Sequence, residues 1–83
     1  MSAINDAVIA IEGYVGKLAL RGAKPVDLQV RASGDDVDVI KVWVDLGPSS
    51  VDPVDWATAC EAAIKQAIPG AAAFRVQVRA EKL

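Results

Sequence analysis

Along this chain, the spacing of apolar residues changes between the period of a helix and the period of a strand. The order of these segments is the sequence feature that most constrains the fold. Residues 2–22 place apolar side chains at three- and four-residue steps, as one face of a helix does. Residues 26–32 alternate apolar and polar side chains, as a half-buried strand does. Residues 37–46 also have strand character, with Ile40, Val42, Val44 and Leu46 on one face and Val39 and Trp43 on the other beside Lys41 and Asp45. A second helical pattern covers residues 52–68, and a last alternating one covers residues 73–80. The sequence therefore predicts the order helix, strand, strand, helix, strand.

Capping and turn residues set the expected ends of these elements. Ser2 is a good cap for the first helix, which we expect to continue to Gly22. Residues 33–36 (Ser-Gly-Asp-Asp) have turn chemistry, so the first two strands should form a hairpin. Asp52 caps the second helix, and Pro53 suits its first turn.

Length and topology together predict the fold class. A chain of 83 residues has room for a single core, so we expect one domain over residues 1–83. The helical crossover between the second and third strands should be right-handed, which makes these two strands parallel. One-sided alternation in the first and third strands leaves one polar face, so both helices should cover the other face. We predict an α+β fold: a two-layer αββαβ domain with a three-stranded sheet and both helices on one face. Which strand lies in the middle stays open.

Trp43 is the most informative residue about function. If Val42 and Val44 face the helices, alternation places Trp43 and Val39 on the uncovered face. A tryptophan among arginines can anchor a protein interface or stack on a nucleobase, and the simplest alternative is a lone tryptophan covered by arginine stems. The net charge of −2 and the few other aromatic residues favour a protein partner over nucleic acid. The expected neighbours are Arg31, Arg75 and Arg79, with Lys41, Gln29 and Gln77.

Small residues on the first helix form a second candidate surface. Gly13 and Gly16, with Ile9 and Leu20, make a stripe on which another backbone could approach closely. The segment Gly13-Tyr14-Val15-Gly16 also matches the letters of the GxxG loop of KH domains, which binds nucleic-acid backbone. Both glycines fall within one continuous apolar pattern, so we favour helix packing.

The sequence offers little for catalysis or metal binding. The chain has no histidine, which is the commonest general base and metal ligand. Its only cysteine, Cys60, falls at an apolar helix position and is expected to be a small core residue. Asp35, Asp36 and Asp38 lack the spacing of an EF-hand loop, and we interpret them as a solvated turn. We expect no enzyme activity, no metal and no cofactor.

Targeting signals are also missing from the sequence. The first residues lack the positive charge and unbroken apolar run of a signal peptide, and no run reaches the roughly 18 apolar residues of a membrane span. A lone thiol fits a reducing compartment. We therefore expect a soluble, cytoplasmic protein, or one in a particle assembled in the cytoplasm. Trp56, at the start of the second helix, could extend an interface or cover the core, and we favour the core.

Several segments resemble known small αββαβ domains. Residues 37–45, the capped helix from Asp52 and residues 74–78 resemble the N-terminal domain of the bacterial ribosome maturation factor RimP. Residues 4–9 and 76–78 are loosely similar to the alkaline-shock envelope-stress family. The iron-sulfur assembly family is similar in pattern, but Gly47-Pro48-Ser49-Ser50 stands where that family has its cysteine. The first resemblance implies an RNA- or ribosome-associated factor. Related domains in secretion rings and phage particles imply an assembly subunit, including a virion component.

These observations lead to one expected function and one alternative. We expect a non-catalytic protein–protein interaction or assembly module that forms an oligomer or a subunit of a larger complex. The alternative is an RNA-associated factor. The expected partner-binding residues are Trp43, Val39, Arg31, Arg75, Arg79, Gly13 and Gly16.

Overall fold

The alternating segments form strands and the segments of helical period form helices, in the predicted order. The structure is a computed structural model that describes residues 2–33 and 38–83. The predicted hairpin turn at residues 34–36, and with it Asp35 and Asp36 of the acidic turn, lies outside the described residues. The elements are α1 (Ala3–Val15), β1 (Asp27–Ala32), β2 (Val39–Asp45), α2 (Pro53–Ala67), the 3-10 helix η1 (Pro69–Ala73) and β3 (Arg75–Glu81).

The sheet has β2 in the middle, which the sequence left open. β1 pairs with β2 in an antiparallel ladder, and β3 pairs with the other edge of β2 in a parallel ladder. The parallel pairing confirms the expected crossover through α2. Val42 lies opposite Val30 on β1 and Val78 on β3, so apolar residues form continuous rows across all three strands.

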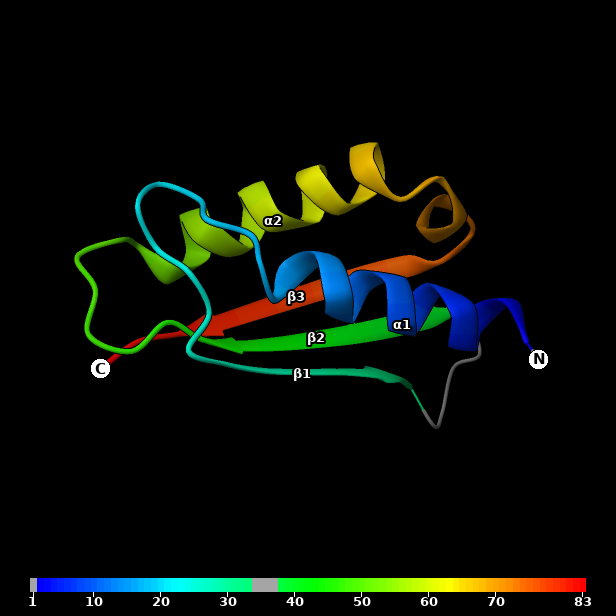
Figure 1. The fold of residues 1–83 in the computed structure, drawn as a ribbon, viewed down its shortest axis with the longest axis horizontal. Coiled ribbons are helices and arrows are strands. Elements are labelled where there is room, and N and C mark those ends of the chain that lie inside the picture. Colours follow the sequence, from blue (N-terminus) through cyan, green and yellow to red (C-terminus); the bar gives the residue numbers. More distant parts are fainter. Residues whose placement is uncertain (1, 34–37) are drawn as a thin grey trace.

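Both helices cover the same face of the sheet, as predicted (Figure 1). α1 packs mainly against β1, and α2 packs mainly against β3. The core between the two layers is entirely apolar, because no polar or charged side chain is buried among the described residues. Its fully buried side chains include Ile11, Val15, Ile40, Val42, Val44, Trp56, Cys60 and Ile64.

The first helix is shorter than predicted. α1 begins after Ser2, whose hydroxyl accepts a hydrogen bond from the Asn5 amide, but it ends at Val15 rather than Gly22. Gly16 is its C-cap, and the next amides make i→i+3 bonds that tighten the last turn. Leu18 still packs against the core from this turn. Leu18 keeps the apolar spacing of a helix although it lies after the end of α1, and for this reason the predicted helix was too long.

A tight turn follows α1 and is fixed to the core by Trp56. Leu20 and Ala23 exchange backbone hydrogen bonds, and the two residues between them, Arg21 and Gly22, both have positive φ, as a type I′ turn requires. The Trp56 indole is fully buried and donates from Nε1 to the carbonyl oxygen of Ala23 at 3.1 Å. Trp56 thus lies inside the core and also holds the connection between α1 and β1.

The last strand begins two residues later than predicted. Residues 69–73 form η1, which the sequence analysis did not predict, and β3 starts at Arg75. Phe74 lies before the strand, half-buried against the core, and its amide donates to the carbonyl of Ala71. The apolar character of Phe74 was read correctly, but its place in the strand was wrong.

Candidate partner-binding face

The helix-free side of the sheet, called here the open face, carries a patterned set of polar side chains around one tryptophan. Alternation places every second strand residue on this face, and the strand register aligns these residues in rows across the sheet. The residues of the open face are Asp27, Gln29 and Arg31 from β1; Val39, Lys41, Trp43 and Asp45 from β2; and Arg75, Gln77, Arg79 and Glu81 from β3.

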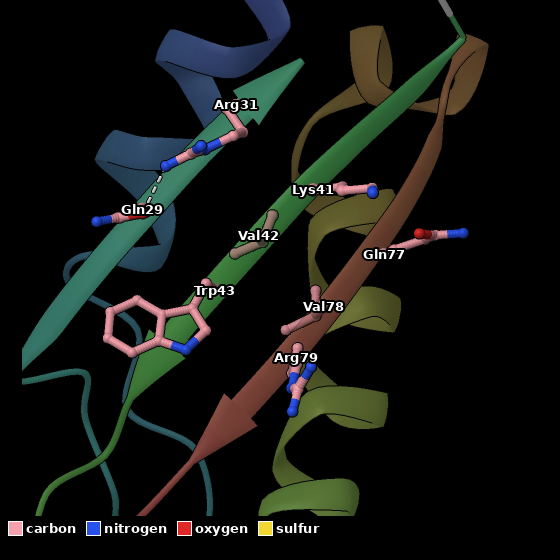
Figure 2. Close-up of a pocket in the computed structure, with 8 residues that line it drawn as sticks. All are labelled: Gln29, Arg31, Lys41, Val42, Trp43, Gln77, Val78 and Arg79. Atoms are coloured by element: carbon pink, nitrogen blue, oxygen red, sulfur yellow. Dashed lines mark hydrogen bonds between the residues drawn. The ribbon is translucent and has the colours of Figure 1, made fainter. Parts of the chain in front are cut away.

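The middle row of the open face is centred on Trp43. Trp43 lies opposite Gln29 on β1 and Arg79 on β3. The indole is half-buried, whereas Trp56 is completely buried. Because no helix covers this side of the sheet, part of the indole is exposed to solvent (Figure 2). We call these three residues the tryptophan row.

A basic row lies on one side of the tryptophan row. It consists of Arg31, Lys41 and Gln77, which are paired across the three strands. The guanidinium of Arg31 donates from Nη2 to Oε1 of Gln29 at 2.7 Å, which ties its position to the tryptophan row (Figure 2). Arg75 adds a further cation beyond this row.

An acidic row lies on the other side. Asp27, Asp45 and Glu81 are direct neighbours across the three strands. Asp45 accepts a hydrogen bond from the Gly47 amide at 2.8 Å, and Glu81 is 3.5 Å from Nε of Arg79 in an exposed ion pair. Like charges directly opposite each other weaken a sheet. The contacts of Asp45 and Glu81 within the chain offset part of that repulsion, and the row gives this end of the face a negative charge.

The side chains around Trp43 enclose a shallow hollow of about 510 Å³. Figure 2 shows the indole, the Arg31–Gln29 pair and Arg79 around it. A second hollow of about 520 Å³ lies between α1 and η1, and alanines make up half of its lining residues. The first hollow combines the Trp43 indole with the cations Arg31, Lys41 and Arg79, and tryptophan and arginine are enriched at protein-binding surfaces.

Most of the residues predicted for this face lie together on it and are accessible to solvent, but one of them, Val39, is buried. Trp43, Arg31, Arg75 and Arg79 all lie on the open face, and the three arginines are exposed. Val39 differs, because it is only 6% exposed and has little area to offer a partner. Alternation fixes the side of a strand on which a residue lies, but not how much of the surrounding chain covers it.

The predicted glycine stripe is not continuous. Gly13 is in α1 with open space where a Cβ would be, Gly16 is the C-cap, and Leu20 lies outside the helix in the type I′ turn. Both glycines are exposed in the helix layer, so they do not join the open face. No element of the described chain makes the close approach that the stripe was expected to permit.

The described residues give little support for chemistry at a buried site. Cys60 is fully buried, and this burial, with a smaller effect from the charge of Glu61, raises the pKa of its thiol to about 12. The core position predicted for Cys60 is confirmed. Within residues 2–33 and 38–83, no three metal-binding side chains come together. Neither described helix has the length and hydropathy needed to cross a membrane.

Strand register, rather than residue type, organises the open face, and the sequence analysis missed its acidic row. Asp27, Asp45 and Glu81 are far apart in the sequence, and only the pairing of all three strands aligns them.

Comparisons with protein-family models, curated proteins and solved structures find no match for this chain.

Proposed function

We propose that this protein is a non-catalytic assembly module that binds a protein partner through its open face. The observation that carries this proposal is Trp43, a large aromatic side chain at the centre of a face that no helix covers. Tryptophan, tyrosine and arginine are enriched among the few residues that dominate binding energy at protein interfaces. Arg79 on β3 lies beside Trp43, and Gln29 on β1 lies on its other side. The Arg31 side chain donates a hydrogen bond to Gln29.

The sheet that carries the face also supports binding. Its side chains project from three paired strands, and Arg31 is already held by Gln29. Surfaces that are organised before binding lose less conformational entropy when the partner arrives. The polar residues around the indole match the common arrangement of an apolar centre within a polar rim.

The absence of catalysis is part of the proposal. The chain has no histidine, and its one thiol is in the core with a raised pKa. Catalytic nucleophiles need access to substrate and an environment that activates them, and Cys60 has neither. The open face has carboxylates and cations but no buried polar side chain to hold a reacting group.

RNA binding through the same face, which the resemblance to RimP implies, remains the alternative prediction. Trp43 and the basic row would suit a base and a phosphate. The acidic row beside them would repel the next phosphates of a strand, and it occupies a whole end of the face. This arrangement favours a protein partner, which can present charges of both signs.

The test is photo-crosslinking in cells of the source organism. A benzophenone amino acid replaces Gln77 on the open face in one variant and Gln66 on α2 in a matched control; both glutamines are exposed. We expect protein adducts from position 77, none from position 66, and loss of the adducts when Trp43→Ala is added.

Three outcomes would contradict the proposal. RNA adducts without protein at position 77 would favour the RNA-associated alternative. Equal adducts at positions 66 and 77 would show that the open face has no special role. Adducts at position 77 that persist in Trp43→Ala, with an unchanged circular dichroism spectrum, would remove Trp43 from the interface.

A further inference from the structure

The rows of the open face have opposite charge on the two sides of Trp43. Alternate residues on a strand are about 7 Å apart, so the basic row and the acidic row lie at about this distance on either side of the tryptophan row. One end of the face is therefore positive, the other is negative, and the centre is apolar. A surface of this kind is complementary to itself when it is turned by half a rotation.

We propose that the partner of the open face is a second copy of this chain, packed face to face and related by a two-fold axis that runs along the tryptophan row. This inference rests on the proposed function and names its partner. The axis lies between the two sheets and across the strands, so each strand faces the same strand of the second copy in the opposite direction. Such an isologous contact is the commonest way in which identical chains pair.

The axis determines which charges meet. Asp27 lies opposite Arg31 of the second copy, because these residues are two positions to either side of Gln29 on β1. Asp45 lies opposite Lys41 in the same way on β2. The symmetry doubles each of these contacts. The acidic row thus meets the basic row of the second copy.

The same geometry places the two Trp43 indoles together at the centre. Arg79 also lies on the axis, and its guanidinium is compensated by Glu81 of its own chain at 3.5 Å. A two-fold axis parallel to the strands would instead place the acidic row on the acidic row. Both axes stack the two sheets with their strands aligned, but only the axis across the strands brings opposite charges together. Charge complementarity therefore favours that axis.

The size of the face predicts how strong the contact is. Three strands about 4.8 Å apart, one of six residues and two of seven, span about 14 by 23 Å, so each copy contributes roughly 300 Å² in projection. Stable interfaces use about 800 Å² per partner. The contact is smaller than this, so we expect a weak, concentration-dependent dimer that is dissociated at low micromolar concentration.

The test is sedimentation equilibrium of charge-reversal variants, from low micromolar concentration to about 1 mM. Arg31→Asp and Asp27→Arg each place like charges opposite each other, so each should weaken the dimer at least about tenfold. The double variant carrying both changes restores opposite charges and should recover the dimer. An equimolar mixture of the two single variants should form a mixed dimer, because each supplies the charge that the other lacks.

Matched controls carry the same charge changes in the helix layer. Lys17→Asp and Glu12→Arg alter exposed residues away from the open face and should leave the dissociation constant unchanged. Circular dichroism of every variant verifies that the domain stays folded.

The results separate this inference from the proposed function. A wild-type protein that stays monomeric at about 1 mM overturns the self-dimer, while position 77 can still crosslink to another protein. A dimer that the single reversals leave unchanged, or that the folded double variant does not recover, overturns the proposed axis. Equal weakening by the control variants would show only a general effect of net charge and would also overturn it.

Discussion

Replacing each tryptophan of the chain by phenylalanine should have very different effects on stability, although the substitution is the same. Trp56 is fully buried, and its Nε1 donates to the Ala23 carbonyl at 3.1 Å. Trp43 is half-buried on the open face, where phenylalanine would remain next to water. The comparison therefore tests whether the structure assigns one tryptophan to the core and the other to the surface.

The magnitude for Trp56→Phe has three parts. Loss of the indole hydrogen bond costs about 1 kcal/mol, and the Ala23 carbonyl still accepts from the Leu20 amide at 3.0 Å, so it is not left without a partner. The void left by the pyrrole ring costs about 1 kcal/mol, and the lost apolar burial about another 1 kcal/mol. The total of about 3 kcal/mol is large against the roughly 4–12 kcal/mol expected for a domain of this length.

The assay is urea denaturation followed by far-UV circular dichroism at low micromolar concentration, where the proposed dimer is dissociated. With a denaturant dependence of about 1 kcal/mol per molar urea, Trp56→Phe should lower the midpoint by about 3 M. Trp43→Phe should change the free energy of unfolding by less than about 0.5 kcal/mol. If Trp43→Phe destabilises the domain as much as Trp56→Phe does, the assignment of the two side chains is refuted.

Further substitutions test local features of the fold by the same denaturation assay. Gly13→Ala should stabilise the domain by about 0.5–1 kcal/mol, because this exposed helical position has open space for a Cβ; destabilisation would contradict this. Gly47→Ala should destabilise it by about 1–2 kcal/mol, because φ is +65° and a Cβ would lie 3.4 Å from Val26. Asp52→Ala should cost about 1 kcal/mol, because the carboxylate caps α2 through the Val54 amide at 2.9 Å; no loss would contradict this. Above pH 9, wild type should lose stability relative to Cys60→Ala, because the unfolded chain releases the thiol proton first while the folded state keeps it up to about pH 12. A difference between these two proteins that stays constant from pH 8 to 11 would contradict this.

The sequence predicts the layers of this fold well because alternation and helical spacing depend only on near neighbours. The alternation of residues 26–32 placed Arg31 on the polar side of its strand, and the crossover rule made β2 and β3 parallel. Both inferences hold because one face of the sheet must be buried, and a shift by one residue would expose the apolar side. The end of α1 was less predictable, because Leu18 keeps the helical spacing while it packs from a turn.

The pattern of charge on the open face was beyond the reach of the sequence, because it depends on register. Asp27 meets Asp45 only for one alignment of the hairpin, and Asp45 meets Glu81 only for one alignment of the parallel pair. A shift of either pairing by two residues keeps every side chain on its face but separates the acidic row. Hydrophobic pattern therefore identifies the face, whereas the rows within it require the structure.

The two tryptophans show why residue type alone does not assign a role in this domain. Trp56 is in α2, on the side of the helix that faces the core, and its indole N–H donates to the carbonyl oxygen of Ala23 in the connection between α1 and β1. Trp43 stands in the central strand, where its neighbours Val42 and Val44 already occupy the core side and leave the indole to the other face. A strand buried on one side that carries a tryptophan outward leaves part of the indole exposed to water. The acidic row lies on the same face, two residues along each strand from the tryptophan row. Under the proposed function, a partner with the opposite order of charges covers both the indole and the acidic row.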